Sequence, residues 1–132
     1  MYPSYFHHSL VLLATIACVA GAQQDAMPST DTHQSLAKEL VDILSQTEIQ
    51  LNSCTDEAGI TAAIPALLEL SQRTAKLKQR QKALPEPTVQ DYLAAQNLVG
   101  DFNTLAQAIE QHIARLQREN LLSPQLKKIL LP

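Results

Sequence analysis

The sequence has little glycine and cysteine and none of the short motifs that carry common chemistry. Only three glycines and two cysteines occur in 132 residues. It has no glycine-rich phosphate loop, no HExxH zinc motif and no CxxC pair. The Glu-x-x-His signature of di-iron bundles is absent too, because Thr30 and Ile109 stand three residues before His33 and His112. We therefore predict that the protein is not an enzyme and that it carries no metal or cofactor.

Positive charge and aromatic residues are also too few for nucleic-acid recognition. The formal net charge is -3, and aromatic residues make up 4% of the chain. A nucleic-acid-binding domain usually has a basic surface, often with aromatic side chains on which bases stack. The one basic stretch, RTAKLKQRQK, contains no aromatic residue. We expect no nucleic-acid partner.

The N-terminal apolar segment is too short to cross a bilayer. It covers residues 10–19 with one threonine, whereas a hydrocarbon core of roughly 30 Å needs about 20 apolar residues as a helix. Small residues at Ala20 and Ala22 suit the pocket of a signal peptidase, which would leave Gln23 as the first residue of the mature chain. The sequence predicts a signal peptide over residues 1–22 and an exported protein, either periplasmic or extracellular.

A second processing site gives an alternative localisation. Ala17 followed by Cys18 resembles part of a lipobox, and cleavage before Cys18 would leave a lipoprotein anchored through that cysteine. Thr15 and Ile16 depart from the lipobox pattern, so cleavage after Ala22 is the favoured prediction. Cys54 is then the only cysteine left, so no intramolecular disulfide can form and stability must come from packing.

After the leader, the chain has the periodicity of helices and shows no strand pattern. Residues 23–31 are polar and predict a flexible leader, and residues 32–132 predict a single helical domain. Roughly 110 residues suffice for one core. Apolar residues recur at three- and four-residue intervals in three long stretches. These residues are Leu36, Leu40, Ile43, Leu44, Thr47 and Leu51; then Ile60, Ala63, Leu67, Leu70, Thr74, Leu77 and Leu84; then Tyr92, Ala95, Val99, Phe102, Ala106, Ile109, Ile113 and Leu116.

Capping residues and prolines predict where the helices begin and end. The first helix covers about 32–51. Thr55 can cap the second helix, in which Pro65 predicts a kink or a restart near Ile64. The loop LPEPT ends that helix, and Thr88 with Asp91 forms a capping box for the third. A short final helix starts from the Ser-Pro pair at 123–124.

Short connections between long helices predict an all-α fold, an antiparallel three-helix bundle with a short C-terminal helix. Heptad-like spacing in the second and third helices is typical of a coiled-coil seam, which predicts that they form a long helical hairpin. At 1.5 Å per residue both helices outreach the first, so we expect the tip of the hairpin to project beyond it.

Two stretches resemble a group of small exported bacterial helical-bundle proteins of unknown function. They are CTDEAGITAAIPALLEL and LKQRQKALPEPTVQ, and the likeness covers about residues 36–118. It implies fold and export, without chemistry. The layout is also similar to that of periplasmic b-type four-helix cytochromes, which hold haem between a methionine of the first helix and a histidine of the last. Here Met27 lies in the leader and the last helix has no histidine.

The two histidines of the expected domain are also poorly placed for a shared iron. In the bundle as predicted, His33 lies near the level of Leu98, and His112 lies about 20 Å further along at helical rise. We expect His33 on the surface of the first turn and His112 at a rim beside Arg115.

Cys54 is a candidate site because it stands in the polar turn NSCTDE. We expect the thiol to be accessible to solvent. The acids Asp56 and Glu57 oppose a lowered pKa, and neither histidine is expected nearby, so catalysis is not predicted. An unpaired thiol in an exported protein suggests an intermolecular disulfide or a tolerated free cysteine.

The basic stretch 73–82 is the second candidate site, with five basic residues and no acid. One helical stripe of it consists of Arg73, Lys76 and Arg80, whereas Lys78 and Lys82 point elsewhere. The stripe suits an anionic lipid surface, a polysaccharide or an acidic protein. Alternatively it is a solvated face that Asp91 and Asp101 partly compensate.

Together these features predict an exported, non-catalytic helical bundle that acts through contacts with an unknown protein partner or with itself. Peripheral contact with an anionic surface is a further option. The alternative is a carrier of haem or of an apolar small molecule, held between the helices.

Overall fold

The structure, a computed structural model, describes residues 30–131, and all regular secondary structure in this range is helical. The helices are α2 (His33–Ser53), α3 (Glu57–Lys82), α4 (Val89–Arg118) and α5 (Pro124–Leu130). The all-α prediction is confirmed for this part of the chain. The predicted processing residues Cys18, Ala20, Ala22 and Gln23 lie outside the described residues. None of the four helices is both long enough and apolar enough to cross a membrane.

Side-chain caps fix three helix starts at the predicted positions. Thr32 caps α2 and forms a capping box with Ser35, which satisfies backbone N–H groups that have no partner within the helix. Thr88 and Asp91 form the predicted capping box of α4. Ser123 accepts a hydrogen bond from the N–H of Leu126, and proline follows it in the first turn of α5.

The start and the course of α3 differ from the prediction. Its N-cap is Asp56 and not Thr55, because the Asp56 carboxylate accepts a hydrogen bond from the N–H of Gly59 at 2.7 Å. No restart occurs near Pro65, and α3 continues through it as one helix. Ala63 and Leu67, on either side of the proline, are both buried in the same core, which holds the two halves of the helix in place.

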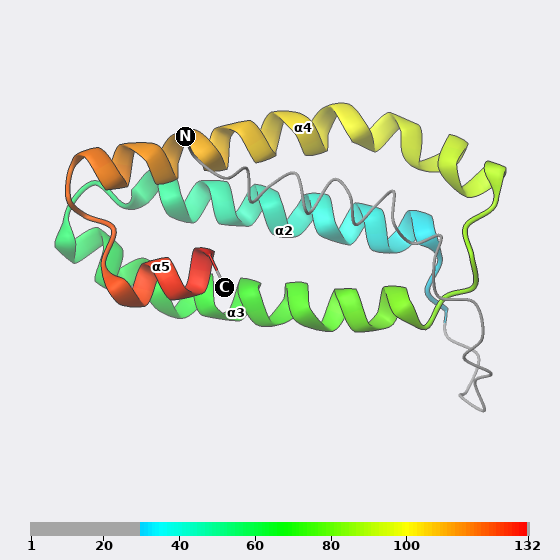
Figure 1. The fold of residues 1–132 in the computed structure, drawn as a ribbon, viewed down its shortest axis with the longest axis horizontal. Helices are drawn as coiled ribbons and strands as arrows, with labels where there is room; N and C mark the ends of the chain where they lie inside the picture. The colour runs from blue at the N-terminus through cyan, green and yellow to red at the C-terminus, as the bar shows by residue number, and fades with distance from the viewer. Residues whose placement is uncertain (1–29, 132) are drawn as a thin grey trace.

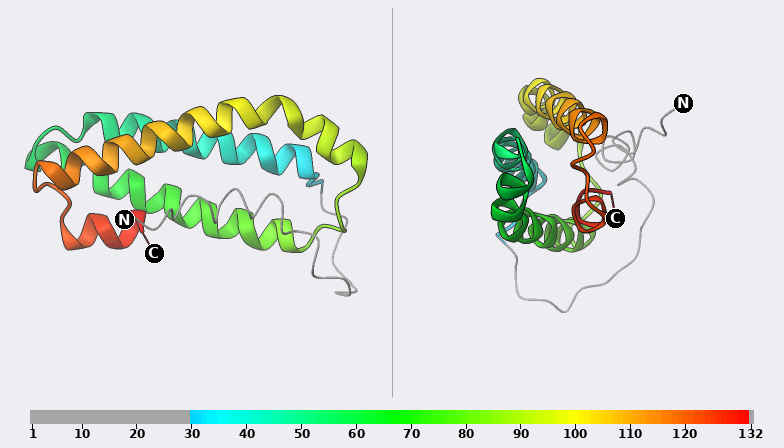
Figure 2. Two further views of the ribbon diagram at one scale, coloured as in Figure 1. Left: turned by 45° about the horizontal axis from the view of Figure 1, so that its top comes forward. Right: turned by 90° about the vertical axis from the view of Figure 1, so that its left-hand side faces the viewer.

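Helix α2 is the centre of the arrangement and packs against both α3 and α4. Figure 1 shows that the chain reverses direction after α2 and again after α3. Viewed end-on in Figure 2, α2 lies between α4 and α3, and α5 lies on the open side opposite α2. The short α5 packs against α3.

The packed hairpin expected between the second and third helices is wrong, because α3 and α4 scarcely touch along their described length. Residues 85–88 connect them without regular structure, and Pro85 and Pro87 favour an extended backbone there. The loop therefore keeps α3 and α4 apart, and each of them packs against α2 instead of against the other. Figure 1 shows this connection at the end of the molecule away from α5.

The tip of this connection extends past the first turn of α2 (Figure 1), and two contacts link it to the start of that helix. His33 in the first turn of α2 donates from Nε2 to the carbonyl of Pro85 at 2.8 Å. Just before α2, Asp31 pairs with Arg80 near the end of α3. The beginning of α2 is thus tied to the loop.

Two clusters of buried side chains form the core. The larger one lies at the α5 end and consists of Leu51, Cys54, Ile60, Ala63, Leu67, Ile109, Ile113, Leu116 and Leu126. The smaller one lies between α2 and α3 and consists of Ile43, Leu70 and Leu77. Helix α5 lies beside only the first half of α3 (Figures 1 and 2). A hollow is lined by α2, the second half of α3 and the start of α4, so we describe the space between α3 and α4 as a groove that α5 covers at one end.

Candidate functional site

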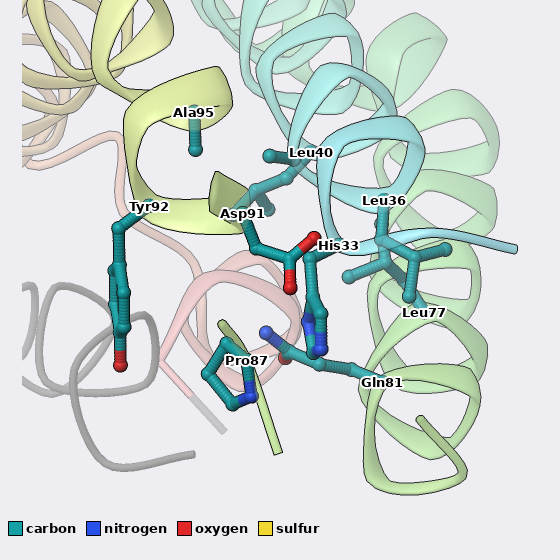
Figure 3. Close-up of a pocket in the computed structure, with 10 residues that line it drawn as sticks. His33, Leu36, Leu40, Leu77, Gln81, Pro87, Asp91, Tyr92 and Ala95 are labelled. Atoms are coloured by element: carbon teal, nitrogen blue, oxygen red, sulfur yellow. The ribbon is translucent and has the colours of Figure 1, made fainter. Parts of the chain in front are cut away.

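The open half of the groove between α3 and α4 contains a cavity of about 40 Å³ (Figure 3). We call this half the open groove. Its lining comes from all three long helices and from the loop: His33, Leu36, Ala37, Leu40, Leu77, Gln81, Pro87, Asp91, Tyr92 and Ala95. Most of these side chains are apolar, with α2 as the floor and α3 and α4 as the walls. The site is therefore an apolar surface with a small hollow in it.

The polar groups of the open groove are used in holding the backbone. The ring of His33 hydrogen-bonds to the loop carbonyl of Pro85. The carboxylate of Asp91 accepts from the N–H of Thr88 at 2.7 Å and from its hydroxyl at 2.8 Å. These two hydrogen bonds lower the pKa of Asp91, so the carboxylate stays ionised.

Exposed apolar side chains continue the site along the first half of α4. Val89 is 72% exposed, Leu93 55%, Tyr92 48% and Val99 47%. Tyr92 and Val99 were expected in a seam with the second helix, and their exposure is a correction. Among residues 30–131 no helix lies opposite them, because α3 stands away from α4 and α5 reaches only the first half of α3. We call these four residues the α4 apolar face.

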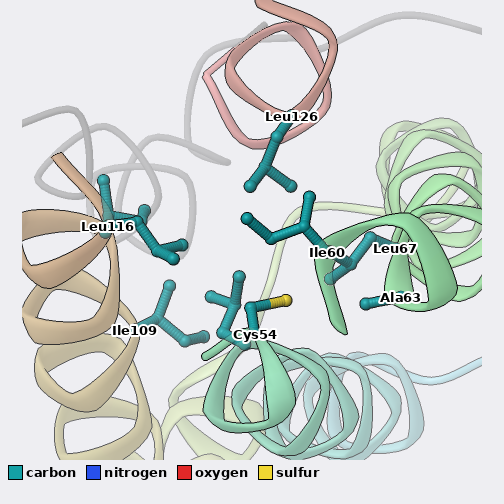
Figure 4. Close-up of a cluster of buried hydrophobic side chains, with 9 residues drawn as sticks. Cys54, Ile60, Ala63, Leu67, Ile109, Leu116 and Leu126 are labelled. Carbon is teal, nitrogen blue, oxygen red and sulfur yellow. The ribbon is translucent and has the colours of Figure 1, made fainter. Parts of the chain in front are cut away.

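Helix α5 closes the other half of the groove (Figure 4). Its Leu126 is fully buried in the larger core cluster, and Ile129 and Leu130 pack against the same cluster. The lysines at 127 and 128 are exposed. The groove therefore already accommodates a short amphipathic helix, with leucine and isoleucine inward and lysine outward.

The thiol of Cys54 is buried, which contradicts the expected solvent access. Its exposed fraction is 0%, and Figure 4 places it among the core side chains. Cys54 follows Leu51 by three residues and so points to the same side of the chain, while its polar neighbours Ser53 and Thr55 are exposed. The thiol donates to the carbonyl of Gln50 at 3.3 Å. The premise of an intermolecular disulfide at Cys54 is thereby removed.

Burial raises the pKa of the Cys54 thiol, although the nearby charge of Arg115 opposes this shift. A protonated thiol without access is a poor nucleophile. Arg115 lies beside it for a structural reason, because its guanidinium donates to the carbonyls of Cys54 at 3.0 Å and of Leu51 at 3.1 Å. Cys54 is the C-cap residue of α2, and the Leu51 carbonyl also accepts from the backbone N–H of Cys54 at 3.1 Å, so Arg115 adds a second donor at the end of this helix.

The predicted anionic-partner stripe of Arg73, Lys76 and Arg80 is largely neutralised. Arg80 pairs with Asp31 at 2.6 Å and with Glu39 at 2.7 Å, and these hydrogen bonds raise its pKa. Arg73 pairs with Asp42 at 3.2 Å. The compensating acids come from α2 and its leading residue, and not from Asp91 and Asp101 as expected, because α3 packs on α2. Of the stripe, only Lys76 is exposed and forms no ion pair with the residues described.

The histidines lie on different parts of the fold. His33 sits at the open groove, level with the start of α4, whereas His112 lies in the second half of α4 with its Nε2 3.1 Å from Glu48 of α2. His112 is half-buried between two helices and not at the expected solvent rim. Within residues 30–131 no group of three or more metal-ligating side chains is brought together.

A second hollow of about 140 Å³ lies on the other side of the α2–α3 contact and is lined by Gln46, Ile49, Gln50, Ala66, Glu69, Leu70 and Arg73. Ligand sites for small molecules usually measure about 300–1,000 Å³. Both hollows are smaller than that range.

No family model, curated protein or solved structure matches the chain.

Proposed function

We propose that the protein is an exported, non-catalytic helical bundle whose open groove binds a protein partner. The observation that carries this proposal is the α4 apolar face beside a mainly apolar hollow, with 47–72% of each of its four large side chains exposed to solvent. Contiguous exposed apolar surface on a soluble domain marks an interaction site more often than scattered single residues do.

The free energy available from burying the α4 apolar face indicates that the partner contacts more than this face. Full burial of a valine or leucine side chain yields about 1.5–3 kcal/mol, so covering the exposed half of four such residues yields about 4 kcal/mol. A micromolar complex needs about 8 kcal/mol after the entropic cost of association. The floor of the groove and its rim must therefore contribute, which favours an occupant that lies along the groove.

The proposed architecture is an antiparallel three-helix unit of α2, α3 and α4, to which α5 adds a partial fourth helix. A signal peptide over residues 1–22 directs export to the periplasm or the exterior, with anchoring through Cys18 as the alternative. N-terminal sequencing or intact mass of the exported protein tests this, because it distinguishes a chain that begins at Gln23 from one with diacylglycerol on Cys18.

A carrier of haem or of an apolar molecule is the competing function, and it has less support. The hollows of about 40 and 140 Å³ are below the range for such ligands. A Soret absorbance band in protein purified from its native source would decide in favour of haem.

Mild crosslinking in the native envelope tests the protein-contact proposal directly. The wild-type chain is expected to be recovered with a defined partner, and Leu93→Glu is expected to lose it, because a charge on the α4 apolar face cannot be desolvated cheaply. Gln111→Glu is the matched control, since it adds the same charge to an exposed position in the second half of α4. Equal recovery of the partner by all three chains, with unchanged helicity, would contradict a contact at this face.

A further inference from the structure

Helical spacing places two lysines of α3 next to the residues that line the open groove, and we call this side its α3 rim. Lys78 follows Thr74 by four residues and precedes Gln81, which lines the cavity, by three, so the three positions share one helical stripe. Lys82 follows Lys78 by four residues and extends the rim toward the loop. Both lysines are exposed, and neither forms an ion pair with any residue that the structure describes.

Three acidic residues near this rim are engaged elsewhere, whereas Glu86, four residues after Lys82 in the loop, is exposed. Glu39 and Asp42 of α2 pair with Arg80 and Arg73 on the other side of α3. Asp91 is held in the capping box by Thr88. The opposite rim, in the first half of α4, presents neutral Gln96 and Gly100. The open groove therefore has a basic rim on the α3 side and a mainly apolar rim on the α4 side, with ionised Asp91 at the loop end of the α4 rim.

Helix α5 indicates what kind of element fits between these rims. It occupies the continuation of the same groove and turns Leu126, Ile129 and Leu130 inward. A second helix placed in line with α5 would find apolar side chains from α2 below it and the α4 apolar face beside it. From Tyr92 to Phe102 the open part is about 15 Å long at helical rise, which corresponds to about ten residues.

We infer that the open groove binds an amphipathic helix of a partner protein, about three turns long, with an aliphatic face inward and acidic side chains on the flank that faces α3. This inference rests on the proposed function and names the partner's chemistry. The aliphatic face covers Leu40, Tyr92 and Val99. The acidic flank pairs with Lys78 and Lys82. Helix-in-groove recognition of this kind is read by anchors at three- and four-residue spacing.

Two labelled peptides of equal length and helicity test this inference on the protein as isolated from its native source. Both carry leucine at positions i, i+3, i+4 and i+7, and their flanks differ, with glutamate in one and lysine in the other. By fluorescence anisotropy the glutamate peptide is expected to bind at least ten-fold more tightly at low salt. The ratio is expected to shrink at high salt, because exposed charges are screened.

Variants of the protein then locate the contact. The double variant Lys78→Ala with Lys82→Ala is expected to weaken binding of the glutamate peptide several-fold and to leave the lysine peptide unchanged or tighter. Lys38→Ala, an exposed α2 residue, is the matched control and is expected to have no effect. Equal binding of the two peptides, binding of neither, or insensitivity to the double variant would overturn the inference.

A photocrosslinking amino acid in place of Tyr92 distinguishes the peptide from other occupants of the open groove. Crosslinks to the glutamate peptide support the inference. Crosslinks to this chain's own residues before Thr30, to a second copy of the chain, or to vesicles containing phosphatidylglycerol, each in preference to the peptide, would overturn it. Failure of the peptides while Leu93→Glu still abolishes partner recovery overturns the inference and leaves the proposed function standing, so the two failures are distinguishable.

Discussion

Arg115 supplies the cation that α2 lacks at its own carboxyl end. The last turn of α2 contains no basic residue, and two of its terminal carbonyls accept from the Arg115 guanidinium instead. A cation at the C-terminus of a helix interacts favourably with the helix dipole. One side chain thus ties α4 to the end of α2.

Replacement of Arg115 by alanine should therefore destabilise the protein. Loss of two hydrogen bonds from a charged donor to half-buried carbonyls is expected to lower the free energy of unfolding by about 2–4 kcal/mol. Lysine should recover part of this loss, because it keeps the charge without the fork geometry. Urea unfolding measures the effect, and Arg118→Ala, an exposed residue three positions on, should change stability by less than about 0.5 kcal/mol. Equal effects at 115 and 118 would refute the capping role.

The thiol of Cys54 gives a second test at this scale. Because the thiol is buried and its pKa is raised, a thiol-specific chromogenic reagent should react with it much more slowly in the native protein than in urea. Protein isolated without reductant should show no dimer linked through this cysteine. Native reactivity equal to that of the unfolded chain would contradict the burial.

The role of a single residue was predictable from the sequence where its neighbours along the chain determine it. It was not predictable where packing against residues far away in the sequence determines it. Thr88 with Asp91 and Ser123 before Pro124 act as predicted, since a cap depends on a few neighbouring residues. Cys54 was misplaced, because its polar neighbours suggested exposure and its cover comes from Leu126, more than seventy residues away.

At the scale of elements, two glycines in helices should respond oppositely to alanine. A Cβ at Gly59 would lie 2.7 Å from the backbone carbonyl oxygen of Ser53, so the turn between α2 and α3 would have to shift. Gly59→Ala is expected to destabilise by about 1–3 kcal/mol. At Gly100 nothing lies within 4 Å of the added atom, and Gly100→Ala should stabilise α4 by about 0.5–1 kcal/mol. Thermal melts of the two variants measure the contrast, and a shift of the same sign in both would contradict it.

The start of α4 should make stability depend on pH. Hydrogen bonds from Thr88 lower the pKa of Asp91 in the folded protein, so the unfolded chain takes up this proton first as the pH falls. The contribution of Asp91 is therefore fully present above its ordinary pKa of about 4 and is lost as the pH falls through the lower folded value. Asp91→Asn should flatten this part of the stability profile, measured by urea unfolding between pH 2 and 6. An unchanged profile would argue against the cap as its source.

Helix positions followed from apolar periodicity, but the contacts between helices did not. The spacing of Leu67, Leu70 and Leu77 predicts one buried face, and all three are buried. It does not say which helix covers that face. The sequence suggested a direct seam with the third helix, whereas α2 and α5 provide the cover, because the proline loop keeps α4 apart.

At the scale of the whole molecule, the open groove follows from unequal helix lengths. Helix α5 has 7 residues, while α3 and α4 have 26 and 30. With only 7 residues, α5 covers one end of the groove between α3 and α4 and leaves the other end open. The sequence did not predict this site, because its periodicity does not show how much of the groove α5 covers. Tyr92 and Val99 were therefore expected in a seam between helices. The anionic-partner patch was expected at Arg73, Lys76 and Arg80, whose charge acidic residues of α2 and Asp31 largely neutralise.

The stability of the end of the groove that α5 covers should depend on α5, and the reaction rate of the Cys54 thiol measures this dependence. Leu126 is fully buried beside Cys54 in the larger core cluster (Figure 4). Leu126→Ala is expected to cost about 2–5 kcal/mol, from lost burial and the cavity left behind.

Since α5 packs mainly on α3 and has only two turns, this loss should appear first as undocking of α5. In Leu126→Ala the Cys54 thiol should therefore react many-fold faster under conditions in which the far-ultraviolet circular dichroism of the three long helices is retained. Lys128→Ala, on the exposed side of α5, should leave the rate unchanged. If the thiol instead becomes reactive only in step with global loss of helicity, α5 is part of one cooperative unit and the two ends of the groove do not differ in local stability.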